Sequence, residues 1–415
     1  FFYSQPIKFS ARYVRITSQQ IGLKMNEVIF HDTNGDRIPA TVIAQLNVME
    51  ESTLYSDANN IFDEQDTLEG LPSWWNSTYF DEIYHARTAY EHLHGTAPYE
   101  TSHPPLGKVI MSLGIAIFGM VPFGWRVMGA LAGILMLPAM YLLGKQLTKK
   151  SSFAFAAALM LALDCQHFTQ TRIATIDSYP VLFILFSWLF MLRFMQRDIV
   201  RLPVKNLLPD LALSGLFMGL GIASKWIGVY SGAGLAVAFF WTIFRHMRMA
   251  ATSAHLLKTD KSLSDEDRKI LTLRDQTTMK RVLVICLWCL LFFVAIPLAI
   301  YLLAYIPYFA YAHFDNLKDY LTAVWNAQLR MFSYHSKPGL GMDHPFYSPW
   351  YEWIFNQRPM YYASPTYVNT PGWSYAIWCF GNPAIWSAAL VGFAYTVFMW
   401  AKRHRYTLRK DGETL

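Results

Sequence analysis

The sequence predicts an all-α polytopic membrane protein with a small partial β-sandwich region at its N-terminus. Of its 415 residues, 53% are hydrophobic and only 15% are charged, well below the roughly 25% charged residues of an average soluble domain. Its 14 Trp and 24 Tyr residues are typical of chains that anchor many helix ends where bilayer meets water. The net charge of +6 is spread between apolar segments, so it does not support nucleic-acid binding.

Residues 1–51 differ in pattern from the rest of the chain. Residues 11–17 alternate with period two, and residues 32–36 form a turn cluster, which together predict extended segments joined by a turn. The stretch ARYVRIT, followed by LKMNEVIFHDTNGDRIPA, resembles the final strands of a discoidin-type (coagulation factor 5/8 C-terminal) β-sandwich. We expect such a module to bind carbohydrate or to act as a spacer, with residues 52–73 as a linker. Because the chain begins at Phe1 without a signal peptide, we expect it to be a fragment.

Seven apolar stretches are each predicted to form a membrane-crossing helix, because most approach the roughly 20 apolar residues that a span requires. They are residues 125–144, 152–169, 178–195, 207–224, 226–244, 281–306 and 381–400. Another apolar run, residues 106–121, is shorter and is interrupted by glycines. It predicts an interfacial or re-entrant helix inside a first outer loop at residues 74–124.

Lys and Arg residues in the connectors predict the orientation of these spans. Basic residues gather in alternate connectors, at residues 145–150, 193–205 and 245–281, and again in the tail after residue 401. We expect those sides to be cytoplasmic. The six spans within residues 125–306 then place the first loop and a second loop, residues 307–380, on the same outer side. A seventh span and a basic cytoplasmic tail follow in residues 381–415.

The first outer loop carries an acidic pair, Asp81 and Glu82, shortly before the interfacial run. An isolated Asp-Glu pair is usually solvated surface, but these carboxylates lie where a bilayer-embedded head group would arrive. Ionisable residues at membrane depth are costly, which makes them functional candidates. Those at the same outer level are Arg126, Arg172, Asp177 and Lys225. The alternative is that each basic side chain only reaches out to lipid phosphates.

This set of carboxylates and basic side chains suits the transfer of a sugar from a lipid phosphate. The departing phosphate is an anion of low basicity, so cations stabilise it without a general acid. The acceptor hydroxyl needs a base within hydrogen-bond reach, and we predict Asp81 in that role, with Glu82 or His103 orienting acceptor or base. The sequence has no glycine fingerprint of a soluble nucleotide-binding domain, which argues against a nucleotide-sugar donor.

Five ordered blocks resemble the signature segments of the protein O-mannosyltransferase family of C-fold (GT-C) glycosyltransferases. The resemblance covers about residues 78–400. The blocks are FDEIYHARTAYEHLHG; SHPPLGKVIMSLGIAIFGMVPFGWRVMGALAG; TRIATIDSYPVLFILF; GIASKWIGVY; and, in the second loop, VWNAQLRMFSYH, HPFYSPWYEWIFNQRPMYY and GNPAIW.

The resemblance implies that Asp81 and Glu82 form the catalytic motif and that Arg126 contacts the carrier phosphate. Arg172 and Lys225 fit the same phosphate role. The further predicted substrate-binding residues are His103, Asp177, His335, His344 and Arg358. The family fold has roughly eleven spans, so we expect the first and last to lie outside this chain.

The implied reaction is an inverting transfer of mannose, or a similar hexose, from a polyprenyl phosphate to Ser or Thr of proteins outside the membrane. No cofactor is required. Related C-fold enzymes bind a metal near their acidic residues, but we prefer hydrogen-bonding roles for His103, His335 and His344. The alternatives are a lipid or cell-wall glycan acceptor, a transporter of lipid-linked sugars, and a glycan receptor with an inert membrane part. Dimer formation is left open.

The second loop also bears on the source and on sugar binding. Eukaryotic family members carry a β-trefoil insert there, whereas residues 307–380 are too short to hold one. The resemblance therefore favours a prokaryotic cell membrane over an endoplasmic reticulum membrane. The loop's Trp325, Trp350, Trp353 and Trp373 are expected to anchor it at the interface, and stacking of some of them on sugar is the alternative.

Overall fold

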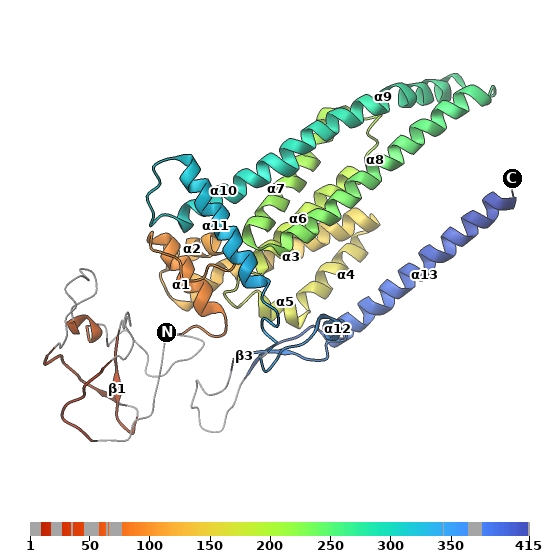
Figure 1. The fold of residues 1–415 in the computed structure, drawn as a ribbon. Helices are drawn as coiled ribbons and strands as arrows, with labels where there is room; N and C mark the ends of the chain where they lie inside the picture. Colours follow the sequence, from red (N-terminus) through yellow and green to blue (C-terminus); the bar gives the residue numbers. More distant parts are fainter. Residues whose placement is uncertain are drawn as a thin grey trace. The chain divides into compact units, whose positions relative to one another are not determined.

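The computed structural model describes most of the chain, in two compact units that are considered separately here (Figure 1). One unit comprises residues 1–79 with 364–376, and the other comprises residues 80–363 with 377–415. The described residues are 10–17, 27–34, 36–44, 58–63, 65, 77–342, 344–363 and 376–413.

The N-terminal unit contains one short hairpin among its described residues. Strand β1 (Phe30–His31) pairs antiparallel with β2 (Arg37–Ile38). The predicted turn lies between them, where the Asp32 carboxylate accepts the backbone N–H groups of Asn34 and Asp36 at 2.8 and 2.9 Å. A single 3-10 turn, η1 (Ala58–Ile61), lies in the predicted linker.

The predicted strand at residues 11–17 is not formed within the described part of the unit. These residues are exposed and carry no strand pairing, and an alternating pattern needs a covered face to fix it as a strand. The discoidin-type fold therefore stays a prediction.

The second unit is helical. Its elements are α1 (Glu82–Leu93), α2 (Leu106–Phe118), α3 (Pro122–Thr148), α4 (Ser151–Ala162), α5 (Cys165–Gln170), α6 (Ser178–Met195), η2 (Val204–Asn206), α7 (Leu208–Ser224), α8 (Ile227–Thr259), α9 (Asp265–Leu290), the π-helical η3 (Leu291–Ala295), α10 (Ile296–Tyr308), α11 (Leu317–His335), α12 (Trp350–Ile354), β3 (Met360–Ala363), β4 (Ile377–Cys379) and α13 (Pro383–Glu413).

Six helical segments within the described residues are long and apolar enough to cross a membrane. They are Pro122–Thr148, Ser178–Met195, Val204–Ser224, Ile227–Thr259, Asp265–Tyr308 and Pro383–Arg403. Each contains or overlaps one of the predicted spans, and the shorter apolar helix α2 matches the predicted interfacial run. The predicted class, a helical polytopic membrane protein, is confirmed.

The prediction of one continuous span at residues 152–169 is wrong. The segment breaks into α4 and α5 at Asp164, whose carboxylate caps α5 by accepting the N–H of His167 at 3.4 Å. The 12 residues of α4 rise about 18 Å, well short of the roughly 30 Å hydrocarbon core. A capping aspartate inside an apolar run is what interrupts the helix.

The broken segment still returns along α3. A Cβ on Gly144 would lie 3.1 Å from Ala154 near the start of α4, and one on Gly133 would lie 2.5 Å from Thr171 just after α5. As the residue numbers increase from α4 to the end of α5, the neighbouring residue numbers in α3 decrease, so this segment runs antiparallel to α3. The two short helices bring the chain back towards the end where α3 begins. The alternation of sides stays a prediction.

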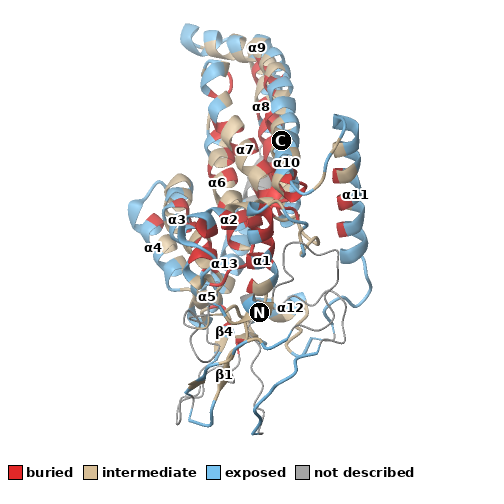
Figure 2. Ribbon diagram, turned by 90° about the vertical axis from the view of Figure 1, so that its left-hand side faces the viewer, coloured by how far each residue is buried: buried red, intermediate tan, exposed pale blue. Residues whose placement is uncertain are grey.

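The helices pack through stripes of buried residues, with exposed outward faces that suit a lipid solvent (Figure 2). The most extensive contact between two described helices joins α6 and α7. There the hydroxyls of Ser187 and Ser214 donate to each other's backbone carbonyls at 3.0 and 2.9 Å. Small residues that allow backbones to approach, with hydrogen bonds across the interface, are characteristic of membrane helix packing.

Gly215 in α7 tests this close packing. A Cβ at this position would lie 2.1 Å from the backbone oxygen of Phe292 in η3, so Gly215→Ala forces two helices apart. We expect a clear loss of thermal stability, measured as the apparent unfolding temperature in detergent. Gly392→Ala in α13 is the matched control, because nothing lies within 4 Å of a Cβ there and alanine favours a helix. Equal behaviour of the two variants would contradict the close packing.

The predicted second outer loop contributes α11, α12 and a two-stranded sheet to the helical unit. Strand β3 pairs antiparallel with β4, with a bulge between Tyr361 and Ala363. Trp325, Trp350 and Trp353 are exposed, and Trp373 lies outside the described residues. Their anchoring or sugar-stacking roles remain predictions.

Candidate active site

The acidic pair begins α1. Phe80 precedes it with a left-handed φ of 52°, and the Phe80 ring packs on Tyr362 with centroids 4.4 Å apart. Asp81 is the N-cap of α1 and Glu82 its first residue. Neighbouring side chains on a helix point about 100° apart, so the two carboxylates meet different surroundings.

Glu82 is fully buried in a clamp that joins three segments. Nε and Nη2 of Arg126, near the start of α3, each donate to one Glu82 oxygen at 2.7 Å. The backbone N–H of Ala174, between α5 and α6, donates to the same carboxylate at 2.9 Å. Such two-pronged pairing fixes geometry as well as charge. Arg126, predicted to contact the carrier phosphate, therefore has two of its N–H groups engaged by Glu82.

A second ion pair lies where α6 begins and α7 ends. Asp177 is the N-cap of α6 and Lys225 the C-cap of α7, and Lys225 Nζ lies 2.5 Å from Asp177 Oδ1. Burial acts to raise the pKa of Asp177, but Lys225 outweighs it, so the pKa lies below its ordinary value. Both side chains keep partial exposure, 38% for Asp177 and 29% for Lys225, so a ligand can reach the pair.

The second outer loop contacts this pair through Gln170. The Gln170 amide donates to Asp177 Oδ2 at 3.2 Å, and its carbonyl oxygen accepts the hydroxyl of Tyr362 in β3 at 2.5 Å. Tyr362 also carries the Phe80 ring. Tyr362 of the second loop thus links Phe80, the residue before Asp81, to Gln170, which donates a hydrogen bond to Asp177.

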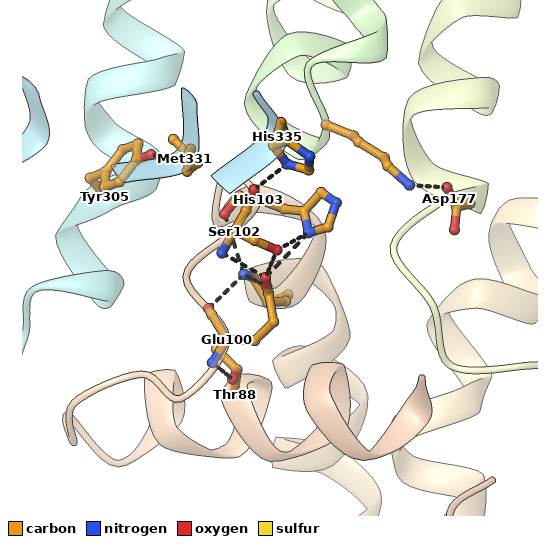
Figure 3. A network of polar contacts seen from close by, with 10 residues as sticks. Thr88, Glu100, Ser102, His103, Asp177, Tyr305, Met331 and His335 are labelled. Atoms are coloured by element: carbon orange, nitrogen blue, oxygen red, sulfur yellow. Dashed lines mark hydrogen bonds and ion pairs between the residues drawn. The ribbon is translucent and has the colours of Figure 1, made fainter. Parts of the chain in front are cut away.

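A buried network supports His103 from below (Figure 3). Lys108 in α2 is fully buried; its ammonium group donates to the Glu100 carboxylate and, at 3.1 Å, to the Glu100 carbonyl. The other Glu100 oxygen accepts Nδ1–H of His103 at 3.2 Å and the hydroxyl of Ser102. Burial acts to raise the pKa of Glu100, but Lys108 and His103 outweigh it and hold that pKa far below its ordinary value.

Three histidine rings line up in this region. His103 lies between His85 and His335, with ring centroids 6.1 and 5.2 Å away. His335, at the end of α11, donates Nε2–H to the Ser102 carbonyl at 2.8 Å, so the second loop is tied to the His103 segment. Burial lowers the pKa of His85 to about 3, which keeps that ring neutral at physiological pH.

Within the part of the chain that the structure describes, Asp81 faces several charges without an ion-pair or hydrogen-bond partner for its carboxylate. Burial raises the pKa of its carboxyl above the ordinary value, and the negative charge of Asp177 raises it further. Lys225, His103 and His344 act in the opposite direction. These interactions bring Asp81, Asp177, Lys225, His103 and His344 into one electrostatic neighbourhood.

The remaining predicted residues have other contacts. Arg172 is exposed, with its guanidinium 4.6 Å from the centre of the Phe168 ring. Nη1 of Arg358 donates to the Tyr347 carbonyl at 2.8 Å. His344 Nδ1 accepts the Phe346 N–H at 3.2 Å. Within the described residues, no group of three or more His, Cys, Asp or Glu side chains is arranged to hold a metal ion.

The sequence that carries this site is similar to sequences of known proteins. A family model described as dolichyl-phosphate-mannose-protein mannosyltransferase matches residues 117–317, which contain α3 to α10. A polyprenol-phosphate-mannose–protein mannosyltransferase of Mycolicibacterium smegmatis is 24% identical over 366 residues, 77% of this chain. This chain is similar in sequence to the protein O-mannosyltransferase family.

Other similar proteins carry the same name. The enzyme of the same name in Mycobacterium tuberculosis is 25% identical over 360 residues and 76% of this chain. The chain spans just under two thirds of these curated relatives, 66% and 64% of their lengths. Among solved structures, the donor-bound Pmt1-Pmt2 complex of Saccharomyces cerevisiae gives a TM-score of 0.42 at 20% identity, covering 58% of this chain and 31% of that one.

Sequence reasoning missed Glu100, Lys108 and Gln170 as parts of the candidate site. Lys108 could have been found, because a lysine two residues into an apolar helix requires an anionic partner and Glu100 lies eight residues before it. Gln170 gives no such signal, because its role depends on which segments of the second loop pack against α5.

Proposed function

We propose that this protein transfers mannose, or a similar hexose, from a polyprenyl-phosphate carrier to Ser or Thr hydroxyls of proteins on the outer side of the membrane. The observation that carries the proposal is the meeting of Asp81 with the Asp177–Lys225 pair. Asp81 supplies a base whose pKa is raised, and Lys225 supplies an accessible cation near it. The names of the two mycobacterial relatives support the same donor and acceptor.

In the proposed reaction, the acceptor oxygen attacks the anomeric carbon from the side opposite the phosphate. The new carbon–oxygen bond takes the electron pair of the hydroxyl oxygen, and the bond to the phosphate oxygen breaks with its electrons. The carrier phosphate leaves as an anion beside Lys225, and Asp81 accepts the hydroxyl proton. Attack from the opposite face inverts the anomeric configuration.

The raised pKa of Asp81 favours this role. A carboxylate becomes a better base as its pKa approaches the working pH, and burial achieves that by disfavouring the charged form. The Asp81 side chain does not cap its own helix, because it accepts no hydrogen bond from a backbone N–H of α1. Its oxygens are therefore available to an acceptor hydroxyl.

Glu82 and Arg126 are proposed as positioning residues. Their clamp joins the start of α1 to α3 and to the segment before α6, the segments that place Asp81 and Asp177. An additional contact of Arg126 with the carrier phosphate remains a prediction, as does a phosphate contact of Arg172. His335 and Ser102 position His103 in the same sense.

Lys225→Met tests the phosphate contact. A hydrogen bond to a charged group contributes about 1.5–3 kcal/mol, so we expect kcat/KM for the polyprenyl-phosphate sugar to fall about 10- to 100-fold. The measurement is steady-state transfer by the purified full-length protein. Lys318→Met, at an exposed lysine of α11 on the same predicted side, is the control. An unchanged kcat/KM in Lys225→Met would remove this residue from the donor site.

Asp177→Asn tests the electrostatic coupling through pH. Asp81 acts as a base only when deprotonated, so activity rises with pH through its pKa, which lies above 3.8. Removing the Asp177 charge removes a contribution that raises this pKa. We therefore expect the acid limb of the kcat/KM profile to move to lower pH. A limb that stays in place, or moves up, contradicts the assignment of that limb to Asp81.

The acceptor and the membrane are part of the proposal. The protein is an integral membrane protein, and we place it in a cell membrane because its second outer loop is short. Incubation with labelled polyprenyl-phosphate mannose and a panel of secreted proteins, lipids and glycans tests the acceptor. Label on Ser or Thr is expected; label confined to lipid or glycan would replace the protein acceptor.

A further inference from the structure

A second site candidate lies far along the chain from Asp81, in the hairpin of α8 and α9. These two helices run side by side beyond the other helices (Figure 1), and a cavity of about 420 Å³ opens between them. Three arginines line it, Arg245 and Arg248 from α8 and Arg274 from α9. Its ten lining residues include no acidic side chain.

The arginines leave donor capacity available in this cavity. Nη2 of Arg245 donates to the Met195 carbonyl at 2.8 Å, and Nη2 of Arg274 donates to Asp198 at 2.8 Å. Nε of Arg274 is buried and has no hydrogen-bond partner within the described residues. A buried donor left unpaired costs about 1–3 kcal/mol, which an anion in the cavity would offset.

Arg248 is the least engaged of the three. It is exposed, and its recorded contact is with the ring of Phe244, 5.9 Å from the guanidinium. Thr252 and Ser253 add hydroxyl groups to the same lining. The cavity therefore presents several donors, and Asp198, the carboxylate that contacts Arg274, is already paired with it.

The position of the cavity specifies its occupant. The apolar part of α8 ends at Phe244, and the exposed rings of Trp241 and Phe244 form the wall on that side. Aromatic belts lie at the head-group level of a bilayer, and the basic connector places this end on the predicted cytoplasmic side. A lipid whose phosphate meets the arginines would have its acyl chains beside these rings.

We propose that the α8–α9 cavity binds the phosphate head group of an anionic phospholipid. Basic pockets between membrane helices on the cytoplasmic side suit such head groups, and the volume matches that of small-molecule sites. The site lies in a different part of the helical unit from Asp81 and takes no part in the transfer reaction. Its ligand holds the two long helices together at the membrane surface.

The test compares lipid binding to the purified full-length protein by native mass spectrometry. The probes are phosphatidylglycerol, phosphatidylcholine and soluble glycerol phosphate. Arg248→Gln is the informative variant, because none of the hydrogen bonds described for this hairpin uses Arg248. Arg268→Gln removes the same charge at an exposed site of α9 outside the cavity and serves as the matched control.

We expect the unaltered protein to bind phosphatidylglycerol in preference to phosphatidylcholine. Arg248→Gln should weaken phosphatidylglycerol about fivefold, since one basic residue near the surface contributes about that factor, and Arg268→Gln should leave it unchanged. Equal losses in the two variants would show general surface attraction and overturn the site. Displacement of the lipid by glycerol phosphate would also overturn it, in favour of a soluble anion.

Discussion

Replacing Asp81 with asparagine should reduce kcat for sugar transfer by about 10²- to 10⁴-fold, the contribution of a positioned general base. Asparagine keeps the size of the side chain but cannot accept the proton of the acceptor hydroxyl. Donor binding should persist, because Lys225 and its surroundings are unchanged. The measurements are single-turnover transfer of labelled mannose and equilibrium binding of the polyprenyl-phosphate sugar, both on the full-length protein.

The matched control is Asp315→Asn, an exposed aspartate that precedes α11 on the same predicted side. It removes one outer carboxylate without touching the site, and it should transfer normally. An Asp81→Asn protein that transfers at the normal rate would exclude Asp81 as the base. A variant that loses donor binding as much as transfer would instead show that Asp81 shapes the donor site.

Breaking the Glu82–Arg126 pair should have the largest effect on stability. Glu82 is fully buried and the Arg126 side chain is 16% exposed, and removing one partner of such a pair typically costs about 3–5 kcal/mol. We expect Glu82→Gln and Arg126→Met each to lower the apparent unfolding temperature in detergent strongly. Unfolding of membrane proteins is often irreversible, so variants must be compared at one heating rate.

A double variant identifies the cause of that loss. If the two side chains stabilise each other, Glu82→Gln with Arg126→Met together should cost less than the sum of the single changes. The alternative is that Arg126 serves the donor phosphate alone. In that case Arg126→Met keeps its stability and raises only the KM for the donor, and the two changes add.

The sequence predicted the membrane helices well because bilayer thickness fixes how long an apolar run must be. It failed at residues 152–169, because the mostly apolar composition of this run was given more weight than the aspartate inside it. The decisive residue was Asp164, which caps α5 and also accepts the backbone N–H of Asn382 at 2.6 Å. A contact with a residue more than two hundred positions away leaves no local trace in the sequence.

The sequence named candidate residues for the site but did not predict how they pair. Membrane topology placed Asp81, Asp177 and Lys225 at one level, because each lies at the outer end of a span or in an outer loop. Topology says nothing about which helix neighbours which. The pairing of Glu82 with Arg126, 44 positions apart, and the burial of Lys108 against Glu100 both depend on that lateral arrangement.

A structure of the full-length protein with a polyprenyl-phosphate sugar would test the central claim most directly. We predict the donor phosphate within about 3.5 Å of Lys225 Nζ, hydrogen-bond distance, with the Asp81 carboxylate facing the anomeric carbon from the opposite side. A donor phosphate bound elsewhere, with Asp81 directed away from the sugar, would contradict the proposed reaction.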